Sequence, residues 1–166
     1  MSLEKIQLPD FILADLFKNH LVLLKNTKLN KDTLPKPSIQ FLGSNLKYIT
    51  ILIKNTEAIY MKDEHLNFLS GILTACKMNF EDIALINLYK TPAINYPLII
   101  QECCPSVILF FGIVQSDIEL PFKLQDFQVL EFNDHLYLSA PGLDAIQSDK
   151  ILKQQLWSKL KEIFVK

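Results

Sequence analysis

In the loops that follow the predicted strands, the side chains able to do acid–base chemistry are few and widely spaced. Glu57 and Asp144 are carboxylates in loops that follow predicted strands, and Asn87 lies near the end of another predicted strand. Such groups can activate water or hydrogen-bond a base edge when a partner group is within reach. Neither acid has a partner nearby in the sequence, so a solvated role is the simpler interpretation for both. For Asn87, bonding to nearby backbone at the strand end is simpler than reading a base.

Histidine and cysteine make no recognisable catalytic or metal-binding pattern. The histidines lie on or beside predicted helices and strands, where structural positions are commoner than catalytic ones. The cysteines form neither a paired C-x-x-C motif nor an even disulfide framework. We therefore expect reduced, buried thiols, no metal, no cofactor and no nucleophilic catalysis. The residues in question are His20, His65, His135, Cys76, Cys103 and Cys104.

The loop after the first predicted strand, from Ile53 to Ala58, contains no glycine. Phosphate-binding loops need glycines so that backbone N–H groups can approach the anion. No serine stands in a G-x-S-x-G turn either, so the nucleophile of an α/β-hydrolase is missing. The sequence predicts neither a Walker-type nor a Rossmann-type nucleotide site.

Length and composition indicate one domain with a dry core. The chain has 166 residues, of which 49% are hydrophobic and 21% charged, and this balance is typical of a globular protein. The longest apolar run, Val107 to Val114, is far shorter than the roughly 18 residues of a membrane helix. Asp10 and Asp15 interrupt the N-terminal apolar stretch, which is untypical of a secretory signal. We expect a cytoplasmic protein without membrane contact.

Charge is unevenly distributed although the formal net charge is −1. The stretch from Lys18 to Lys54 holds seven lysines against Asp32, whereas Gln115 to Asp149 holds seven acids against Lys123. Two faces of opposite sign are therefore predicted. All basic residues are lysine, and the planar fork of arginine, which reads guanine and phosphate by paired hydrogen bonds, is missing. Specific reading of duplex DNA is not expected.

Residues 1–38 are predicted to form an N-terminal helix and a polar linker. Asp10 is a suitable N-cap for a helix from Phe11 to Leu24, and the proline-containing stretch from Lys25 to Ser38 has no helical or strand periodicity. A short amphipathic helix on such a lead can dock in a partner's groove, or it can pack on its own sheet. The sequence leaves both open. The candidate partner-binding residues are Ile12, Leu13, Leu16, Phe17 and Leu21.

Residues 39–166 are predicted to form a single α/β domain. Apolar strands alternate with helices, a pattern typical of a parallel sheet covered on both faces. The predicted fold is a three-layer α/β/α domain with a short, mostly parallel four-stranded sheet. The predicted strands are 48–53, 83–88, 107–111 and 136–139, with 129–132 as a further short candidate, and the predicted helices are 63–76, 95–104 and 149–164.

Ligands of open parallel sheets bind beyond the carboxyl ends of the strands. In this chain those ends lie at four loops: Lys54 to Glu57, Leu88 to Thr91, Gly112 to Gln115 and Ser139 to Leu143. These four loops are where a functional site is expected.

Four stretches, from about Tyr48 to Phe164, resemble the uracil-DNA glycosylase superfamily in order and spacing. They are Asn55-Thr56-Glu57-Ala58, Phe80 to Ile83 leading to Asn87, Pro105 to Ile108, and Ser139 to Leu143 before a helix with Leu156-Trp157. Glycosylases of this type carry a water-activating acid or a glycine-rich turn in the first loop and a histidine before the last helix. The resemblance implies a glycosylase-like fold with a vestigial pocket, at Asn55, Glu57, Asn87, Ala140 and Pro141.

The departures from the glycosylase pattern affect the chemistry of base release. A flipped uracil leaves as an anion, so the enzyme needs a hydrogen-bond donor at the oxygen on which the charge develops. Loss of one such donor lowers the rate about 10²–10³-fold. Ala140 stands where the histidine is expected, and its side chain donates nothing. The iron–sulfur cluster of some of these enzymes needs four cysteines, whereas this chain has three. No catalytic residue is therefore assigned.

The psi subunit family of the bacterial DNA polymerase III holoenzyme is similar to the glycosylase fold but has no active site. This chain resembles it in Ala140 to Leu143, in the cap Ser148-Asp149 and in Leu156-Trp157. The resemblance implies a non-catalytic linker whose N-terminal peptide docks on clamp-loader proteins, while its globular part holds a chi-like subunit. The alternatives are a divergent uracil-DNA glycosylase-like repair enzyme and an unrelated α/β protein.

Overall fold

The computed structural model describes residues 39–91 and 94–165. The predicted N-terminal helix and linker, and with them Ile12, Leu13, Leu16, Phe17 and Leu21, lie outside the described residues. None of the helices in the described ranges is long and apolar enough to cross a membrane.

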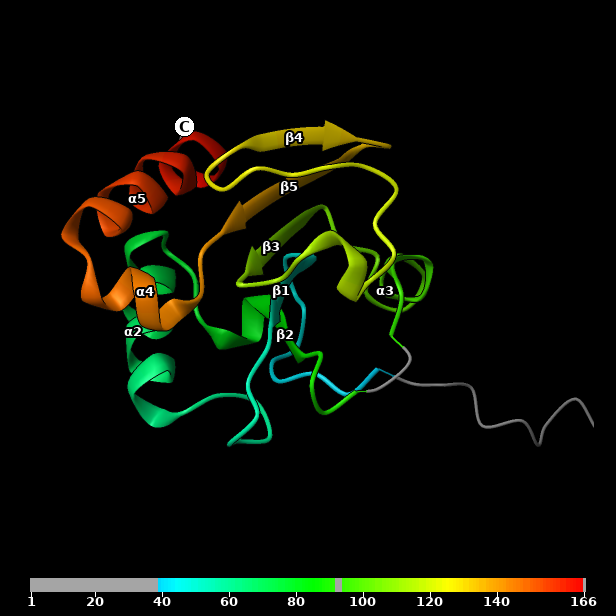
Figure 1. Cartoon of the computed structure of the whole chain (residues 1–166), viewed down its shortest axis with the longest axis horizontal. Helices are drawn as coiled ribbons and strands as arrows, with labels where there is room; N and C mark the ends of the chain where they lie inside the picture. The colour runs from blue at the N-terminus through cyan, green and yellow to red at the C-terminus, as the bar shows by residue number, and fades with distance from the viewer. Residues whose placement is uncertain (1–38, 92–93, 166) are drawn as a thin grey trace, which may run out of the picture. The chain divides into compact units, whose positions relative to one another are not determined.

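The described chain is an α/β fold built on one five-stranded sheet (Figure 1). Its strand order is β2-β1-β3-β5-β4, with β4 antiparallel to β5 and the other neighbours parallel. The elements are β1 (Ile49–Ile53), α2 (Asp63–Ala75), η1 (Phe80–Asp82), β2 (Ile83–Asn87), α3 (Tyr96–Cys103), β3 (Val107–Phe111), η2 (Gln115–Asp117), β4 (Val129–Phe132), β5 (His135–Ala140), α4 (Leu143–Ser148) and α5 (Lys150–Phe164).

Helices cover both faces of the sheet, which explains why the strands lack polar alternation. Every residue of β1, β2 and β3 is buried. Side chains of a strand alternate between the two faces, so Ile49 and Ile51 pack with α2, α4 and α5, whereas Leu52 packs with α3. Figure 1 shows this division, with α3 on one side of the sheet and the other helices across from it. The prediction of a mostly parallel, two-sided sheet is confirmed.

Side-chain caps begin two of the helices where the sequence predicts them. The Asn95 side chain accepts a hydrogen bond from the backbone of Leu98 at the start of α3. The Asp149 side chain accepts from Ile151 and Leu152 at the start of α5. Both are N-cap contacts that satisfy backbone N–H groups left free at a helix start. The short helix α4, which precedes α5, was not predicted.

The sheet has five strands and not the predicted four, because the further candidate at 129–132 is a strand, β4, which forms a hairpin with β5. The two loop residues, Asn133 and Asp134, both have positive φ, at 49° and 62°. Two-residue hairpins favour this conformation, and Asn and Asp adopt it at lower cost than most residues. The hairpin register pairs Phe132 with His135, so β4 runs antiparallel along the outside of β5.

The prediction that all thiols are buried is correct for Cys76 and Cys103 but wrong for Cys104, which is exposed. Cys104 ends α3 in a left-handed conformation, with φ 44°, and this places it at the surface. Burial raises the pKa of the thiols of Cys76 and Cys103, which favours their unreactive protonated form.

The segment before β1 covers the outer edge of β2. Leu42 exchanges two backbone hydrogen bonds of 2.9 Å with Leu85, and the N–H of Asn45 donates to the carbonyl of Ile83 at 3.0 Å. Gly43, between them, has φ 113°, and a Cβ there would collide with the backbone carbonyl oxygen of Ile83. Only glycine allows this close approach.

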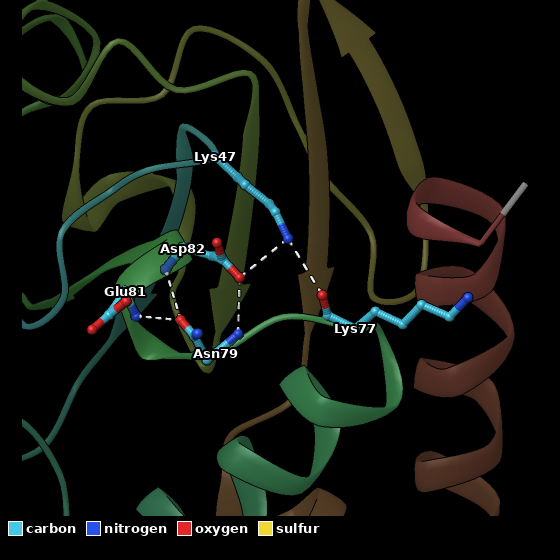
Figure 2. Close-up of polar contacts among 5 residues, drawn as sticks. All are labelled: Lys47, Lys77, Asn79, Glu81 and Asp82. Carbon is cyan, nitrogen blue, oxygen red and sulfur yellow. Dashed lines mark hydrogen bonds and ion pairs between the residues drawn. The ribbon is translucent and has the colours of Figure 1, made fainter.

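A polar cluster, shown in Figure 2, holds this covering segment at the start of β2. The Lys47 ammonium donates to the Asp82 carboxylate at 3.2 Å and to the Lys77 carbonyl at 3.3 Å. The Asn79 N–H donates to Asp82 at 2.9 Å, while the Asn79 side chain accepts from the backbone of Glu81 and Asp82. The hydrogen bond from the Asn79 backbone, with Lys47 nearby, lowers the pKa of Asp82.

Candidate functional site

The sheet order places a topological switch point between β1 and β3. From β1 the chain crosses to β2 on one side and then to β3 on the other, and ligands of open α/β sheets favour the crevice at this point. A cavity of about 130 Å³ lies there, at the carboxyl ends of the two strands. Its lining residues are Ile53, Lys54, Asn55, Met61, His65, Phe111, Gly112, Gly142, Leu143 and Asp144.

The cavity contains a histidine–carboxylate pair from two helices. The Nε2 atom of His65, on α2, lies 3.0 Å from an oxygen of Asp144, in the first turn of α4. The His65 side chain is 8% exposed and that of Asp144 is 85% exposed. His65 shares the buried side of α2 with Leu69 and Leu73, so the helix directs the imidazole toward the sheet. A carboxylate at this position fixes the ring orientation and favours a proton on Nε2.

Two glycines allow the turns after β3 and β5 to approach each other beside this pair. Gly112 has φ 67°, and a Cβ added to it would lie 3.1 Å from the Cα of Gly142. The N–H of Gly112 also donates to the carbonyl of Ala140 at 2.9 Å. A larger residue at Gly112 would push these turns apart, since L side chains rarely adopt this φ.

Lys54 brings positive charge to the rim of the cavity. Its ammonium donates to the Asp117 carboxylate at 2.9 Å, which links the loop after β1 to η2. Both side chains are partly exposed, so the pair is weak by itself and the ammonium can exchange partners with a bound anion.

Asn87 has a structural role at the end of β2, as its position in the sequence suggests. Its side-chain oxygen accepts from the N–H groups of Asn55 and Tyr89. Its amide nitrogen lies within hydrogen-bonding distance of the carbonyls of Asn55, Ala58 and Ile59. Asn87 is 1% exposed, and these contacts use its donors and its acceptor to hold the loop after β1.

The first loop keeps its shape through Asn55, and Glu57 is not among the lining residues of the cavity. The Asn55 side-chain oxygen accepts from the N–H groups of Glu57 and Ala58, at 2.9 and 3.0 Å, which is an Asx turn. The carboxylate of Glu57 is 67% exposed and pairs with Lys62 at 2.8 Å. This hydrogen bond raises the pKa of Lys62.

The pocket residues implied by the glycosylase resemblance are thus only partly brought together. Asn55 lines the cavity, whereas Glu57, Asn87, Ala140 and Pro141 are not among its lining residues. Ala140 is 2% exposed and is the last residue of β5. A structural position was expected for His65, but its place four residues before Leu69 on the apolar side of a helix indicates an imidazole turned inward.

A second cavity, of about 340 Å³, lies beyond the carboxyl ends of β3 and β5. Its walls include Phe110, Ile118 and Leu124, and its polar groups include Ser139 and Asp126. The Ser139 hydroxyl donates to the Asp126 carboxylate at 3.1 Å. This hydrogen bond satisfies the hydroxyl of Ser139, which is buried, and none of the cavity's lining residues in the described ranges is a histidine.

Within residues 39–91 and 94–165 no group of three His, Cys, Asp or Glu side chains is arranged to hold a metal ion. A scan against models of protein families gives no match for this chain, and a search of curated proteins gives none either. Its function must therefore be argued from the site itself.

Proposed function

We propose that the protein is a non-catalytic interaction subunit of the DNA replication machinery, similar to the psi subunit family. The observation that carries the proposal is the bonding of Asn87. In a working glycosylase-like pocket this side chain would face the extruded base, but here its amide bonds to the loop backbone at 2.8 to 3.2 Å. A group committed to holding its own loop is not available to a ligand.

Other contacts at the same end of the sheet support this proposal. Glu57 is exposed, pairs with Lys62 and is not among the lining residues of the cavity. The Ala140 side chain, buried at the end of β5, supplies no donor for a leaving anion. A short parallel sheet with helices on both faces and a cavity between β1 and β3 is compatible with the glycosylase-like fold that we propose for the domain.

The partners in this proposal are clamp-loader proteins and a chi-like subunit, which the protein would bridge in the cytoplasm. The docking peptide would come from residues 1–38, which lie outside the described residues. No specific reading of duplex DNA is involved, because the chain contains no arginine.

The test is affinity capture of the full chain from native extract. We expect clamp-loader proteins to copurify, and we expect their recovery to be lost when Met1 to Leu34 are deleted. Recovery of a replication protein that is unaffected by this deletion would place docking on the globular part. Capture without any replication protein would contradict the proposal.

The His65–Asp144 pair favours one alternative, a divergent glycosylase-like repair enzyme. An imidazole oriented by a carboxylate can give a proton to a leaving base or take one from water, and it stands at the switch point, 3.0 Å from Asp144. Uracil release from single-stranded DNA is the assay. Under our proposal the purified chain releases none; release that falls at least 100-fold in His65→Asn, but not in Glu57→Ala, would establish the alternative.

A further inference from the structure

The two edges of the sheet differ in their backbone hydrogen bonds. Residues of an antiparallel strand alternate between bonding inward to the neighbour and pointing outward. In the β4–β5 hairpin, Phe132 and His135 close the turn, so Leu130 also bonds inward, whereas Val129 and Glu131 point outward. The N–H of Leu136, opposite Glu131, confirms the alternation because it donates away from β4, to the carbonyl of Ser106 at 2.9 Å.

The outward groups of β4 have no backbone partner in the part of the chain that the structure describes. From the described residues outside the hairpin, no hydrogen bond reaches the N–H or C=O of Val129 or Glu131. Figure 1 shows β4 as the outer strand of the sheet, beyond β5. On the opposite edge, both the N–H and the C=O of Leu85 in β2 are hydrogen-bonded to Leu42. Such a row of free N–H and C=O groups is a template for another strand.

Negative charge lies on β4 and beside it in the sequence. Between residues 124 and 134 the chain holds Asp126, Glu131 and Asp134 and no lysine. None of these three carboxylates is in a salt bridge within the described ranges. Glu131 is exposed, while its neighbours on β4 are half-buried. A strand added at this edge would thus meet a field that attracts cations.

We propose that the outer edge of β4 binds an extended segment of a partner protein that carries lysine or arginine opposite Glu131. The N–H and C=O groups of Val129 and Glu131 supply the backbone hydrogen bonds, and the carboxylates select the basic side chains. This inference rests on the proposed function, since it assigns a surface to a protein that acts by contacts.

A second copy of this chain is a poorer occupant for the same edge. Two β4 strands brought together would each contribute Asp126, Glu131 and Asp134, and like charges facing each other across a strand pair are destabilising. A basic strand removes this repulsion and replaces it with attraction.

Three matched nine-residue peptides are the probes for the edge. The first alternates lysine with valine and threonine, the second has glutamate in place of each lysine, and the third is the lysine peptide methylated on alternate backbone nitrogens. Binding to the full chain is measured by fluorescence anisotropy and located by amide hydrogen exchange. We expect the lysine peptide to bind and to slow exchange at Val129 and Glu131 at least about 10-fold.

The control peptides separate strand pairing from simple charge attraction. We expect the glutamate and the methylated peptides each to bind at least about 10-fold more weakly than the lysine peptide. Equal binding of the methylated peptide would overturn the proposal, because it would mean that backbone hydrogen bonds play no part. Protection of amides elsewhere, with none at β4, would overturn it as well.

Variants at Glu131 separate the contribution of backbone hydrogen bonds to peptide binding from the contribution of charge. Proline is tolerated on an edge strand where its N–H would face solvent, so Glu131→Pro should abolish peptide binding while the chain stays folded. Glu131→Gln keeps the N–H and should weaken binding about 3-fold to 10-fold at low salt, whereas Glu102→Gln, an exposed acid on α3, should change nothing. If Glu131→Gln and Glu102→Gln bind alike, the claim of charge selection is wrong.

Two further measurements distinguish this proposal from its alternatives. Sedimentation of the full chain reports self-association; a dimer that dissociates in Glu131→Pro would show that a second copy occupies the edge and would overturn the proposal. Clamp-loader capture that survives in Glu131→Pro, combined with no peptide binding by the wild type, would leave the proposed function intact and refute the edge site alone.

Discussion

The two edge strands of the sheet, β2 and β4, differ in whether their outward backbone groups have hydrogen-bond partners among the described residues. At β2 the segment from Ile39 to Lys47 supplies backbone partners, and the Asn79–Asp82 cluster holds that segment in place. At β4 the outward N–H and C=O groups of Val129 and Glu131 meet no such segment among the described residues. Proteins usually protect sheet edges against unwanted pairing. An edge that is protected by negative charge alone repels acidic strands but can still pair with a basic one.

Gly43→Ala is expected to have the largest effect, because it opens the closed edge. The new Cβ would collide with the carbonyl oxygens of Ile83 and Phe80, at a φ of 113°. We expect a loss of at least about 3 kcal/mol in the free energy of unfolding, measured by urea denaturation.

Gly71→Ala is the matched control for this change. Gly71 lies inside α2 with open space around its Cα, and replacing a helical glycine by alanine should stabilise the protein by about 0.5–1 kcal/mol. If the loss of unfolding free energy in Gly43→Ala is smaller than the gain in Gly71→Ala, the covering segment does not lie on β2 as described.

Asn87→Ala is expected to have the next largest effect, at the carboxyl end of the same edge strand. It removes a buried side chain and leaves the N–H groups of Asn55 and Tyr89 without their acceptor, and we expect a loss of about 2–4 kcal/mol. Thr91→Val, which removes one hydroxyl contact to the Asn87 carbonyl, should cost about 1 kcal/mol or less. Thermal unfolding of both variants is the measurement; equal losses would contradict the structural role of Asn87.

Acid is expected to weaken the closed edge through Asp82. Its pKa is lowered in the folded chain by the Asn79 backbone and by Lys47, so its contribution to stability is present above the unfolded-state pKa and is lost as pH falls through the lower folded value. The wild type should therefore exceed Asp82→Asn in stability at neutral pH, and the difference should narrow below a pH of about 4. A difference that is constant between pH 7 and pH 3 would rule out this contact.

Glu131→Pro is expected to have the smallest effect on stability. The N–H of Glu131 points outward, so proline removes no hydrogen bond of the hairpin, and the free energy of unfolding should change by less than about 1 kcal/mol. Leu130→Pro, one residue earlier on the inward-bonding side of β4, should cost about 2 kcal/mol or more. Similar losses in the two variants, by urea denaturation, would show that the alternation along β4 is misassigned.

Much of the fold could be predicted from local sequence patterns. The strand from Val107 to Phe111 and the helix starts near Asn95 and Asp149 depend on neighbouring residues, and all three lie where the sequence predicts them. The fifth strand was predicted only as a further candidate at 129–132, because β4 is short and half-buried and its pairing depends on a two-residue turn without glycine. The hydrophobic pattern of a sequence does not show whether an added strand pairs parallel or antiparallel with its neighbour.

The candidate site was harder to predict than the fold. Asn55, one of the residues of the implied pocket, lines the cavity, whereas His65 comes from the first turn of α2 and meets Asp144 across 79 residues of chain. Contacts of this kind depend on how helices cross the sheet, which residue spacing does not encode. The structural role of Asn87 was predicted because strand ends often need a side chain to satisfy nearby backbone groups.

Residue-resolved amide hydrogen exchange on the full chain, without any added peptide, tests the contrast between the two edges most directly. The account predicts slow exchange at Leu85, whose N–H is bonded to Leu42 at 2.9 Å, and exchange at least about 100-fold faster at Val129 and Glu131. Equal protection at the two edges would contradict it, because β4 would then already be covered.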